Sequence, residues 1–126
     1  MLTNENNSAI LQSVKLASDK WQSAFNRGDY AECSEQYEDK AVMNVVPFGQ
    51  YIGKEAIKAF WKKLVEDGFS DVEYVKPSIE VIDETSAILT SGWKMNKAGG
   101  TISKELWVLQ QDGTAKLKVD NFEVNS

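Results

Sequence analysis

The sequence contains no histidine. This absence excludes Ser-His-Asp and Cys-His nucleophiles, histidine general bases, and zinc or non-haem iron held by imidazole. Cysteine is nearly absent too, because Cys33 alone is present and cannot form an internal disulfide. Its neighbours Glu32 and Glu35 are acidic and should not lower the pKa of a thiol. We therefore expect Cys33 to be a buried structural residue and not a nucleophile.

Positive charge is scarce as well. Fourteen basic residues stand against nineteen acidic ones, which gives a net charge of −5 and an isoelectric point near 4.8. Arg27 is the single arginine in the sequence, so a site built for bidentate phosphate recognition is not expected. The composition therefore predicts that nucleic acid is not a partner.

Long apolar runs are missing, and none approaches the ~18 residues that would span a bilayer. The first seven residues also lack the basic segment and apolar stretch of a signal peptide. We expect a soluble cytoplasmic protein with no membrane partner. With 126 residues, 42% of them hydrophobic and 26% charged, the chain predicts one globular domain spanning residues 1–126.

The first half of the sequence has helical periodicity. Apolar residues at spacings of three and four predict a helix from about Asn6 to Arg27, with Gly28 at the C′ position. Asp29 then opens a shorter helix to about Tyr37, in a capping-box pattern with Glu32. A third helix is expected to start at Gly53 and to end at Gly68. The apolar stripes are Ile10, Val14, Ala17, Trp21, Ala24 and Phe25 in the first helix, and Ile57, Phe60, Trp61 and Leu64 in the third.

Strand patterns occur between the helices and dominate the second half. Residues Ala41 to Val46 predict a strand that Pro47 ends, with a short return at Tyr51 and Ile52. From Ser70 onward the apolar period changes to two, with turn residues between the segments. Helices followed by a meander of strands predict an α+β domain whose helices cover one face of a curved antiparallel sheet. The four expected strands are about Val72 to Ile82, Ser86 to Met95, Thr101 to Gln110 and Lys116 to Val124.

Four short motifs occur in a familiar order along this chain. They are Phe25 to Tyr30, Tyr37 to Val42, Pro47 to Gly49, and Gly53 to Phe60. Together with the element order, they resemble the NTF2-like superfamily, in particular its SnoaL-like and ketosteroid-isomerase-like branches, over about residues 8–125. This resemblance implies a cone in which a strongly curved, mostly antiparallel sheet wraps around the first helix and leaves an apolar cavity open at one end. It also implies a homodimer formed through the outer sheet face.

The resemblance also identifies three positions to test for chemistry. The ketosteroid-isomerase branch has a tyrosine on the first helix, where this chain has Trp21. An indole donates a hydrogen bond but does not exchange an acidic proton at neutral pH. The branch has an aspartate base before the Pro-Phe-Gly turn, and Val46 stands there. Because valine carries no proton, the isomerase mechanism is excluded in that form.

The third position is a carboxylic acid on the penultimate strand, which corresponds to Glu105. Strict alternation places Glu105 on the same side as Ser103 and Trp107, facing either the cavity or solvent, and a slip of one residue reverses the face. Asp120, on the last strand, could pair with Glu105 inside the cavity, where two close carboxyls would raise one pKa. The two possible inner faces of the last strand are Lys118, Asp120 and Phe122, or Leu117, Val119 and Asn121.

Three functional hypotheses follow. The first is a cavity that binds a small hydrophobic molecule, although the same aromatic side chains could instead fill a closed core. The second is an isomerase, dehydratase or cyclase that uses Glu105 and Asp120 as catalytic carboxyl groups on an apolar ketone or polyketide-like substrate. The residues expected to line the pocket are Trp21, Phe25, Val46, Phe60, Leu89, Ser91, Trp93, Trp107 and Phe122.

The third hypothesis is a non-catalytic homodimeric assembly module. An antiparallel sheet with helices on one face must cover its other face, and the alternations Val72/Tyr74 and Leu117/Val119 could supply the apolar contact. No cofactor or metal is predicted. The acidic residues between Asp67 and Asp71, and at Asp83 and Glu84, lack the spacing of an EF-hand.

Overall fold

The computed structural model describes residues 4–125. Their elements follow the order expected from the sequence, three helices and six strands, and no helix in this range has the length and apolarity to cross a membrane. The helices are α1 (Asn4–Asn26), α2 (Tyr30–Glu35) and α3 (Lys54–Glu66). The strands are β1 (Tyr37–Val46), β2 (Gly49–Ile52), β3 (Glu73–Asp83), β4 (Ser86–Lys94), β5 (Gly99–Leu109) and β6 (Ala115–Val124).

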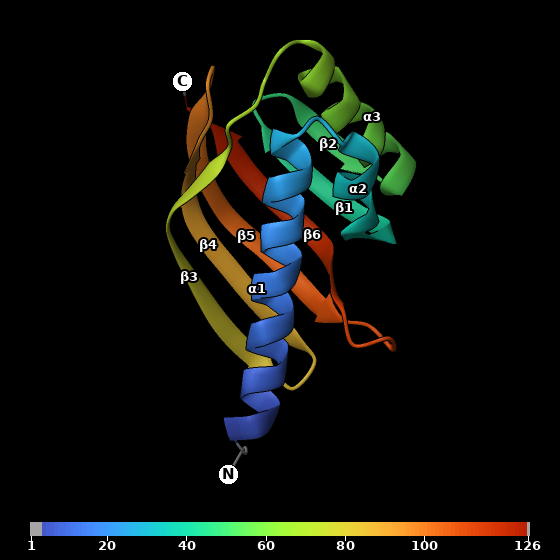
Figure 1. Cartoon of the computed structure of the whole chain (residues 1–126), viewed down its shortest axis with the longest axis vertical. Coiled ribbons are helices and arrows are strands. Elements are labelled where there is room, and N and C mark those ends of the chain that lie inside the picture. Colours follow the sequence, from blue (N-terminus) through green and yellow to red (C-terminus); the bar gives the residue numbers. More distant parts are fainter. Residues whose placement is uncertain (1–3, 126) are drawn as a thin grey trace.

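The strands form one sheet in the order β2-β1-β6-β5-β4-β3. Strands β1 and β6 run parallel, and every other neighbouring pair in this sheet is antiparallel. Helix α1 lies across one face of the curved sheet, while α2 and α3 lie together beside β1 and β2 (Figure 1). This is the α+β, NTF2-like arrangement that the sequence predicted, with the helices on one face.

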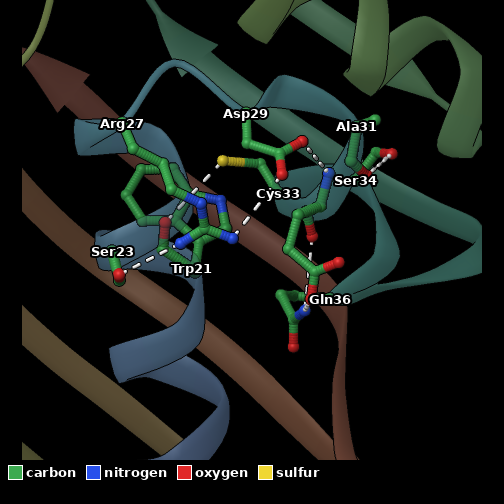
Figure 2. A network of polar contacts seen from close by, with 9 residues as sticks. Trp21, Ser23, Arg27, Asp29, Ala31, Cys33, Ser34 and Gln36 are labelled. Carbon is green, nitrogen blue, oxygen red and sulfur yellow. Dashed lines mark hydrogen bonds and ion pairs between the residues drawn. The ribbon is translucent and has the colours of Figure 1, made fainter.

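A glycine and an aspartate shape the turn between α1 and α2. Gly28 adopts φ 80°, its N–H donates to Phe25 O, and the N–H of Asp29 donates to Ala24 O. This is the Schellman motif expected at a C′ glycine. Asp29 then caps α2 by accepting a hydrogen bond of 3.0 Å from the N–H of Glu32. The turn brings Cys33 beneath α1, where its thiol donates to Trp21 O at 3.7 Å (Figure 2).

Cys33 is fully buried at this joint. Burial is the main cause that raises the pKa of its thiol to about 12, and the charge of Asp29 adds to the effect. A thiol with such a pKa stays neutral near pH 7 and is a poor nucleophile. The expectation of a structural cysteine therefore agrees with its position.

Helix α2 is shorter than expected and ends at Glu35, so Tyr37 belongs to β1. The backbone turns at Gln36 because its carbonyl accepts the N–H of Leu117, and Tyr37 pairs with Leu117 on the parallel strand β6. A contact between residues 80 positions apart thus overrides the local helical pattern.

Two bulges bend the sheet between β5 and β6. Ser103 is an extra residue on β5, and Lys118 is an extra residue on β6. Each bulge shifts the alternation by one position and increases the local bend of the strand. As a result, neither alternation expected for the last strand is correct along its whole length, because Leu117, Asp120 and Phe122 are all buried on the inner face.

The outer sheet face carries one apolar stripe across four strands. Val42 of β1 pairs with Val119 of β6, Val119 pairs with Leu106 of β5, and Leu106 pairs with Ile88 of β4. All four are half-buried. The alternation expected on this face is correct at Val119 only. Leu117 lies in the core, and both Val72 and Tyr74 line the inner cavity, where Tyr74 pairs with Trp93 of β4.

Candidate functional site

A cavity of about 810 Å³ lies inside the curve of the sheet, between α3 and the strands β3 to β6. Its size is typical of a site for a small organic molecule. Helix α3 reaches it because Ile57 and Trp61 anchor one face of the helix in the core, which turns Phe60 and Leu64 to the cavity wall. The aromatic residues of the lining include Trp21, Phe60, Trp61, Phe69, Trp93 and Phe122.

Four of these rings form a continuous row. Trp21 meets the edge of Trp61 with ring centroids 4.9 Å apart, and Trp61 stacks on Phe122 at 5.9 Å. Phe122 then meets Trp93 edge-on at 6.0 Å. Such contacts favour a fixed arrangement of the rings. The row defines an aromatic wall with a tryptophan at each end.

Asp120 is the first of two carboxyl groups buried against this wall. It belongs to β6, lines the cavity and is 4% exposed. Its Oδ2 accepts a hydrogen bond of 2.7 Å from the phenol of Tyr37, whose oxygen accepts the indole N–H of Trp61 at 3.2 Å. Its Oδ1 is buried and has no hydrogen-bond partner among the described residues. Tyr37 therefore fixes one oxygen of Asp120 by a hydrogen bond, and the other oxygen has no hydrogen bond.

Glu105 is the second buried carboxyl group, and it pairs directly with Asp120 in the β5–β6 ladder. Its Oε1 accepts the indole N–H of Trp107 at 2.9 Å. Its Oε2 accepts the phenol of Tyr74 at 3.4 Å. Both oxygens of Glu105 thus have a donor, in contrast to those of Asp120.

The surroundings raise the pKa of both carboxyls. Burial raises the pKa of Asp120 to about 7, although the hydrogen bond from Tyr37 acts in the opposite direction. Burial and the charge of Asp120 together raise the pKa of Glu105 well above its ordinary value. Two carboxyls this close do not readily ionise together, so the pair holds protons more tightly than two separate carboxyls would.

Burial also raises the pKa of the Tyr37 and Tyr74 phenols well above the ordinary value. Both phenols therefore remain protonated and can donate hydrogen bonds to the carboxyls at neutral pH. A group that ionises near pH 7 and is surrounded by fixed donors can accept and release protons. The two carboxyls and their phenol and indole donors could therefore carry out proton transfer.

The structure places only some of the predicted site residues at the cavity. Glu105 and Asp120 lie together on its wall. Four of the predicted lining residues, Trp21, Phe60, Trp93 and Phe122, also line it.

Five predicted lining residues lie elsewhere. Phe25 is fully buried behind Trp21, on which it stacks, and Leu89 is packed in the core. The Ser91 hydroxyl lies within hydrogen-bond distance of the carbonyls of Val75 on β3 and Gly92 on β4, and Trp107 lies behind Glu105. Val46 is 54% exposed, because it faces outward at the end of β1 while Val45 faces the core.

Sequence reasoning missed the tyrosines that hold the carboxyls. Tyr37 was assigned to the end of a helix, and Tyr74 to the outer face of the sheet. The local signal for Tyr37 is weak, because the charged residues Glu38, Asp39 and Lys40 separate it from the apolar strand segment that begins at Ala41. Its partner Asp120 is 83 residues away. No local pattern could have linked the two.

A second groove of about 730 Å³ lies where α2 meets α3. It carries charges of both signs, and two of them, Arg27 and Asp29, form an ion pair at 3.5 Å (Figure 2). The groove contains no buried carboxyl and no unpartnered buried side-chain atom among the described residues. The inner cavity is therefore the candidate functional site.

Comparison with known proteins agrees with this architecture. Residues 19–111 match the model of the SnoaL-like domain family. No curated protein sequence is significantly similar to the chain.

Several solved structures share the fold. A ketosteroid isomerase-like protein from Erwinia carotovora atroseptica superposes with a TM-score of 0.78 and 17% identity, covering 98% of this chain and 99% of the other. An NTF-2 like protein of unknown function from Shewanella oneidensis has a TM-score of 0.76 and 16% identity, over 90% and 98% of the two chains. A protein from Catenulispora acidiphila, solved in complex with S-DNPA, has a TM-score of 0.75 and 13% identity, over 93% and 94%.

Proposed function

This chain belongs to the SnoaL-like domain family, and from that premise we propose that its cavity binds a small apolar ketone and that Asp120 transfers protons on it. One observation carries the proposal. Asp120 is buried on the cavity wall with one oxygen held by Tyr37, the other unpartnered, and a pKa of about 7. A base with this pKa is half ionised at neutral pH and is suited to both accepting and returning a proton.

The proposed step is proton abstraction next to a carbonyl group. Asp120 accepts the proton from the carbon, the electron pair of the C–H bond moves into the new C–C double bond, and the carbonyl oxygen becomes the enolate oxygen. Asp120 then returns the proton to the same carbon or to a conjugated one. Glu105 keeps its own proton, so a single negative charge moves between Asp120 and the enolate.

Proton transfer accounts for the site better than storage of an apolar ligand does. A cavity that only holds a hydrophobic molecule needs no carboxyl groups, and burying them costs free energy unless they are neutral or well paired. Here two carboxyls face the same interior, and four aromatic side chains, Tyr37, Trp61, Tyr74 and Trp107, are arranged around them. This arrangement of hydrogen-bond donors around Asp120 and Glu105 favours a role for the carboxyls in proton transfer.

The test is deuterium exchange into the α-carbon of 2-tetralone in D₂O near neutral pH, followed by proton NMR. We expect the protein to exchange this position faster than buffer does. Asp120→Asn keeps the shape of the side chain and an acceptor for Tyr37, and it should lose about 10²-fold or more of the catalysed rate. Glu123→Gln, an exposed residue of the same strand, is the matched control and should exchange normally. Equal rates for Asp120→Asn and the unmodified protein would refute the proposal.

We also propose that two copies associate through the outer sheet face. The support is the stripe formed by Val42, Val119, Leu106 and Ile88, which crosses four strands on the face of the sheet opposite to α1 (Figure 1). A second sheet packed on this stripe would remove its apolar surface from water.

A further inference from the structure

Tyr74 faces the cavity although a regular alternation along β3 would separate it from Ile79. Tyr74 pairs with Trp93 and Ile79 pairs with Leu89, and both partners are buried on the inner face of β4. Tyr74 and Ile79 both pack against the core. Side chains five positions apart point to opposite faces of a regular strand. An extra residue between Tyr74 and Ile79 is therefore needed to turn both side chains inward.

A bulge supplies this extra residue. Val75 pairs with Gly92 and Ser78 pairs with Thr90, so β3 has one residue more than β4 in this interval. Within the bulge Lys76 adopts φ 56°, a conformation that residues other than glycine adopt only at a cost in free energy. Bulges redirect side chains and are common beside active sites. The bulge thus accounts for the inward direction of Tyr74.

The chain before Tyr74 is fixed as well. The N–H of Val72 donates to Oδ1 of Asn26 at 2.7 Å, and Nδ2 of Asn26 donates to Val72 O at 3.0 Å. The preceding residue, Asp71, adopts φ 61°. Asp71 and Lys76 are the only described residues other than glycine with positive φ, and Tyr74 lies between them. Such conformations persist only where the surrounding structure fixes them.

Tyr74 reaches one carboxyl of the pair, and Tyr37 reaches the other. The Tyr37 phenol donates to Asp120 at 2.7 Å, and the Tyr74 phenol donates to Oε2 of Glu105 at 3.4 Å. Because Trp107 donates to Oε1 of Glu105, Tyr74 is the donor for the second oxygen. Tyr37 is fully buried, whereas Tyr74 is half-buried on the cavity wall. Each carboxyl therefore has its own phenol.

No cation contributes to the environment of Glu105. Among the described residues none forms an ion pair with it, and the lysines of the cavity rim are exposed and bound to Asp67. Helix α3 and strand β4 place only Trp61, Leu89 and Trp93 on the inner side near the pair. An ionised Glu105 thus depends on its two neutral donors. The other titratable or charged groups around the cavity are Asp19, Tyr37, Lys63, Asp67, Lys97 and Asp120.

We propose that Tyr74 is a positioning residue of the carboxyl pair, whose phenol fixes Glu105 opposite Asp120 and stabilises its ionised form, and thereby sets the upper pH limit of proton transfer. This inference rests on the proposed function, in which Asp120 is ionised and Glu105 keeps its proton. Once Glu105 ionises as well, its negative charge opposes formation of the enolate.

The direction of the effect follows from the hydrogen bond. A bond from a phenol to a carboxylate is stronger than one to the neutral acid. Tyr74 therefore lowers the pKa of Glu105, against the larger effects of burial and of the Asp120 charge, which raise it. Tyr37 acts on the pKa of Asp120 in the same direction. One tyrosine thus acts on the lower pH limit of the reaction and the other on the upper limit.

The first test is the pH profile of tetralone exchange, with the buffer rate subtracted. The rate should rise near pH 7 as Asp120 ionises and should fall at higher pH as Glu105 ionises. Tyr74→Phe should move the falling limb upward by about 0.5 to 1 pH unit and leave the rising limb in place. Tyr51→Phe is the matched control, because Tyr51 lines the same cavity and packs against Phe60. It should move neither limb.

A double substitution separates action through Glu105 from a general effect on the fold. Glu105→Gln removes the second ionisation, so its profile should lack the falling limb. Adding Tyr74→Phe to this variant should change the profile no further. A shift of the rising limb that persists in the double variant would mean that Tyr74 acts on the structure and not on Glu105, and would overturn the inference.

The second test needs no substrate. Carbon-13 NMR titration of the side-chain carboxyls should show a higher midpoint for Glu105 in Tyr74→Phe, with a smaller change for Asp120. An unchanged Glu105 midpoint and an unchanged falling limb would overturn the inference, even if Asp120 still exchanges protons on tetralone. If no form of the protein exchanges tetralone, the proposed function is wrong, and the carboxyl titration still decides whether Tyr74 acts on Glu105.

Discussion

The phenol of Tyr37 donates a hydrogen bond of 2.7 Å to Oδ2 of Asp120, joining the first residue of β1 to the middle of β6. This contact decides which oxygen of Asp120 is hydrogen-bonded and which one has no partner among the described residues. It also connects the carboxyl to Trp61 through a second hydrogen bond on the phenol oxygen. Tyr37 is thus a positioning residue for the proposed base.

The first prediction concerns Tyr37→Phe. Since the Tyr37 hydrogen bond lowers the pKa of Asp120, its loss should raise that pKa above about 7. Carbon-13 NMR titration of the carboxyl measures this directly, and the pH profile of tetralone exchange should shift upward with it. The lost hydrogen bonds should also destabilise the fold by about 1–2 kcal/mol.

Tyr30→Phe is the control for that experiment. Tyr30 belongs to α2 and lies away from the cavity, with its ring beneath the ammonium group of Lys62. Its substitution should leave both the Asp120 titration and the exchange profile in place. A Tyr37→Phe protein that titrates like the unmodified protein would show that the hydrogen bond does not act on Asp120.

The second prediction is a loss of stability as pH rises. In the unfolded chain Asp120 has a pKa of about 3.9, and in the folded protein its pKa is raised to about 7. The folded state therefore binds more protons between these values, so the free energy of unfolding should fall from about pH 4 to pH 7, by up to about 4 kcal/mol. The raised pKa of Glu105 acts in the same direction.

Thermal or urea unfolding across this pH range measures the effect. Asp120→Asn removes one of the two titrating groups and should reduce the dependence between pH 5 and pH 7 to the part that Glu105 contributes. Local hydrogen bonds lower the pKa values of the exposed residues Asp83 and Asp112. Their contribution to the free energy of unfolding is therefore lost only when the pH falls well below 5. A stability that rises between pH 5 and pH 7 would contradict the proposed environment of the two carboxyls.

The third prediction concerns Gly100, where β5 lies against both neighbouring strands. A Cβ atom at this position would collide with the backbone carbonyl of Glu123 and would approach Cζ2 of Trp93 to 2.9 Å. Gly100→Ala should therefore destabilise the protein by at least about 2 kcal/mol and should displace the Trp93 ring. Urea denaturation measures the first effect, and the indole signal of Trp93 measures the second.

Gly92 provides the comparison on the next strand. A Cβ atom there would come 3.3 Å from that of Val75, a distance that a backbone shift of Val75 by a few tenths of an ångström relieves. Gly92→Ala should cost less than about 1 kcal/mol. Equal losses at the two positions would mean that the close contact at Gly100 is not what excludes a side chain.

The fourth prediction concerns the outer stripe. Leu106→Glu places a charge in the middle of the four-strand row and should convert the proposed dimer into a monomer, as measured by light scattering at micromolar concentration. Leu16→Glu, the same substitution at an exposed residue of α1 on the other face of the sheet, should leave the dimer intact. An unmodified protein that is strictly monomeric at high micromolar concentration would rule out the interface.

The sequence predicted the order and type of the elements because each has a clear period and clear ends. The apolar stripe that ends at Gly28 and the capping residue Asp29 are local signals, and the structure has them where they were expected. The predicted end of α2 was wrong because Tyr37 pairs with Leu117, a residue far away in the sequence. Local patterns thus predict elements well, and distant pairings correct their boundaries.

The facing of Glu105 and Asp120 could not be settled from the sequence, for a physical reason. Strict alternation fails at Ser103 and at Lys118, where the bulges insert one extra residue. Sequence alone gives no position for a bulge, yet each bulge reverses the face of every residue after it. The bulge at Ser103 places Glu105, in place of Lys104, opposite Asp120 on the inner face, and the bulge at Lys118 turns Leu117 to the same face.

The place of β6 in the sheet has a consequence for how the chain folds. Strand β6 is the last strand in chain order, yet it lies between β1 and β5. Before β6 is synthesised, the β1–β2 hairpin and the β3–β4–β5 meander have no strand to join them, and each presents an open backbone edge. Open edges of this kind can pair with other chains.

Assembly of the sheet must therefore wait until β6 has been synthesised, and the contacts between β1 and β6 join residues far apart in the chain. Folding that depends on such distant contacts is slow. We expect nascent chains that end before residue 115 to aggregate or to require a chaperone, while the full sheet closes in one late cooperative step.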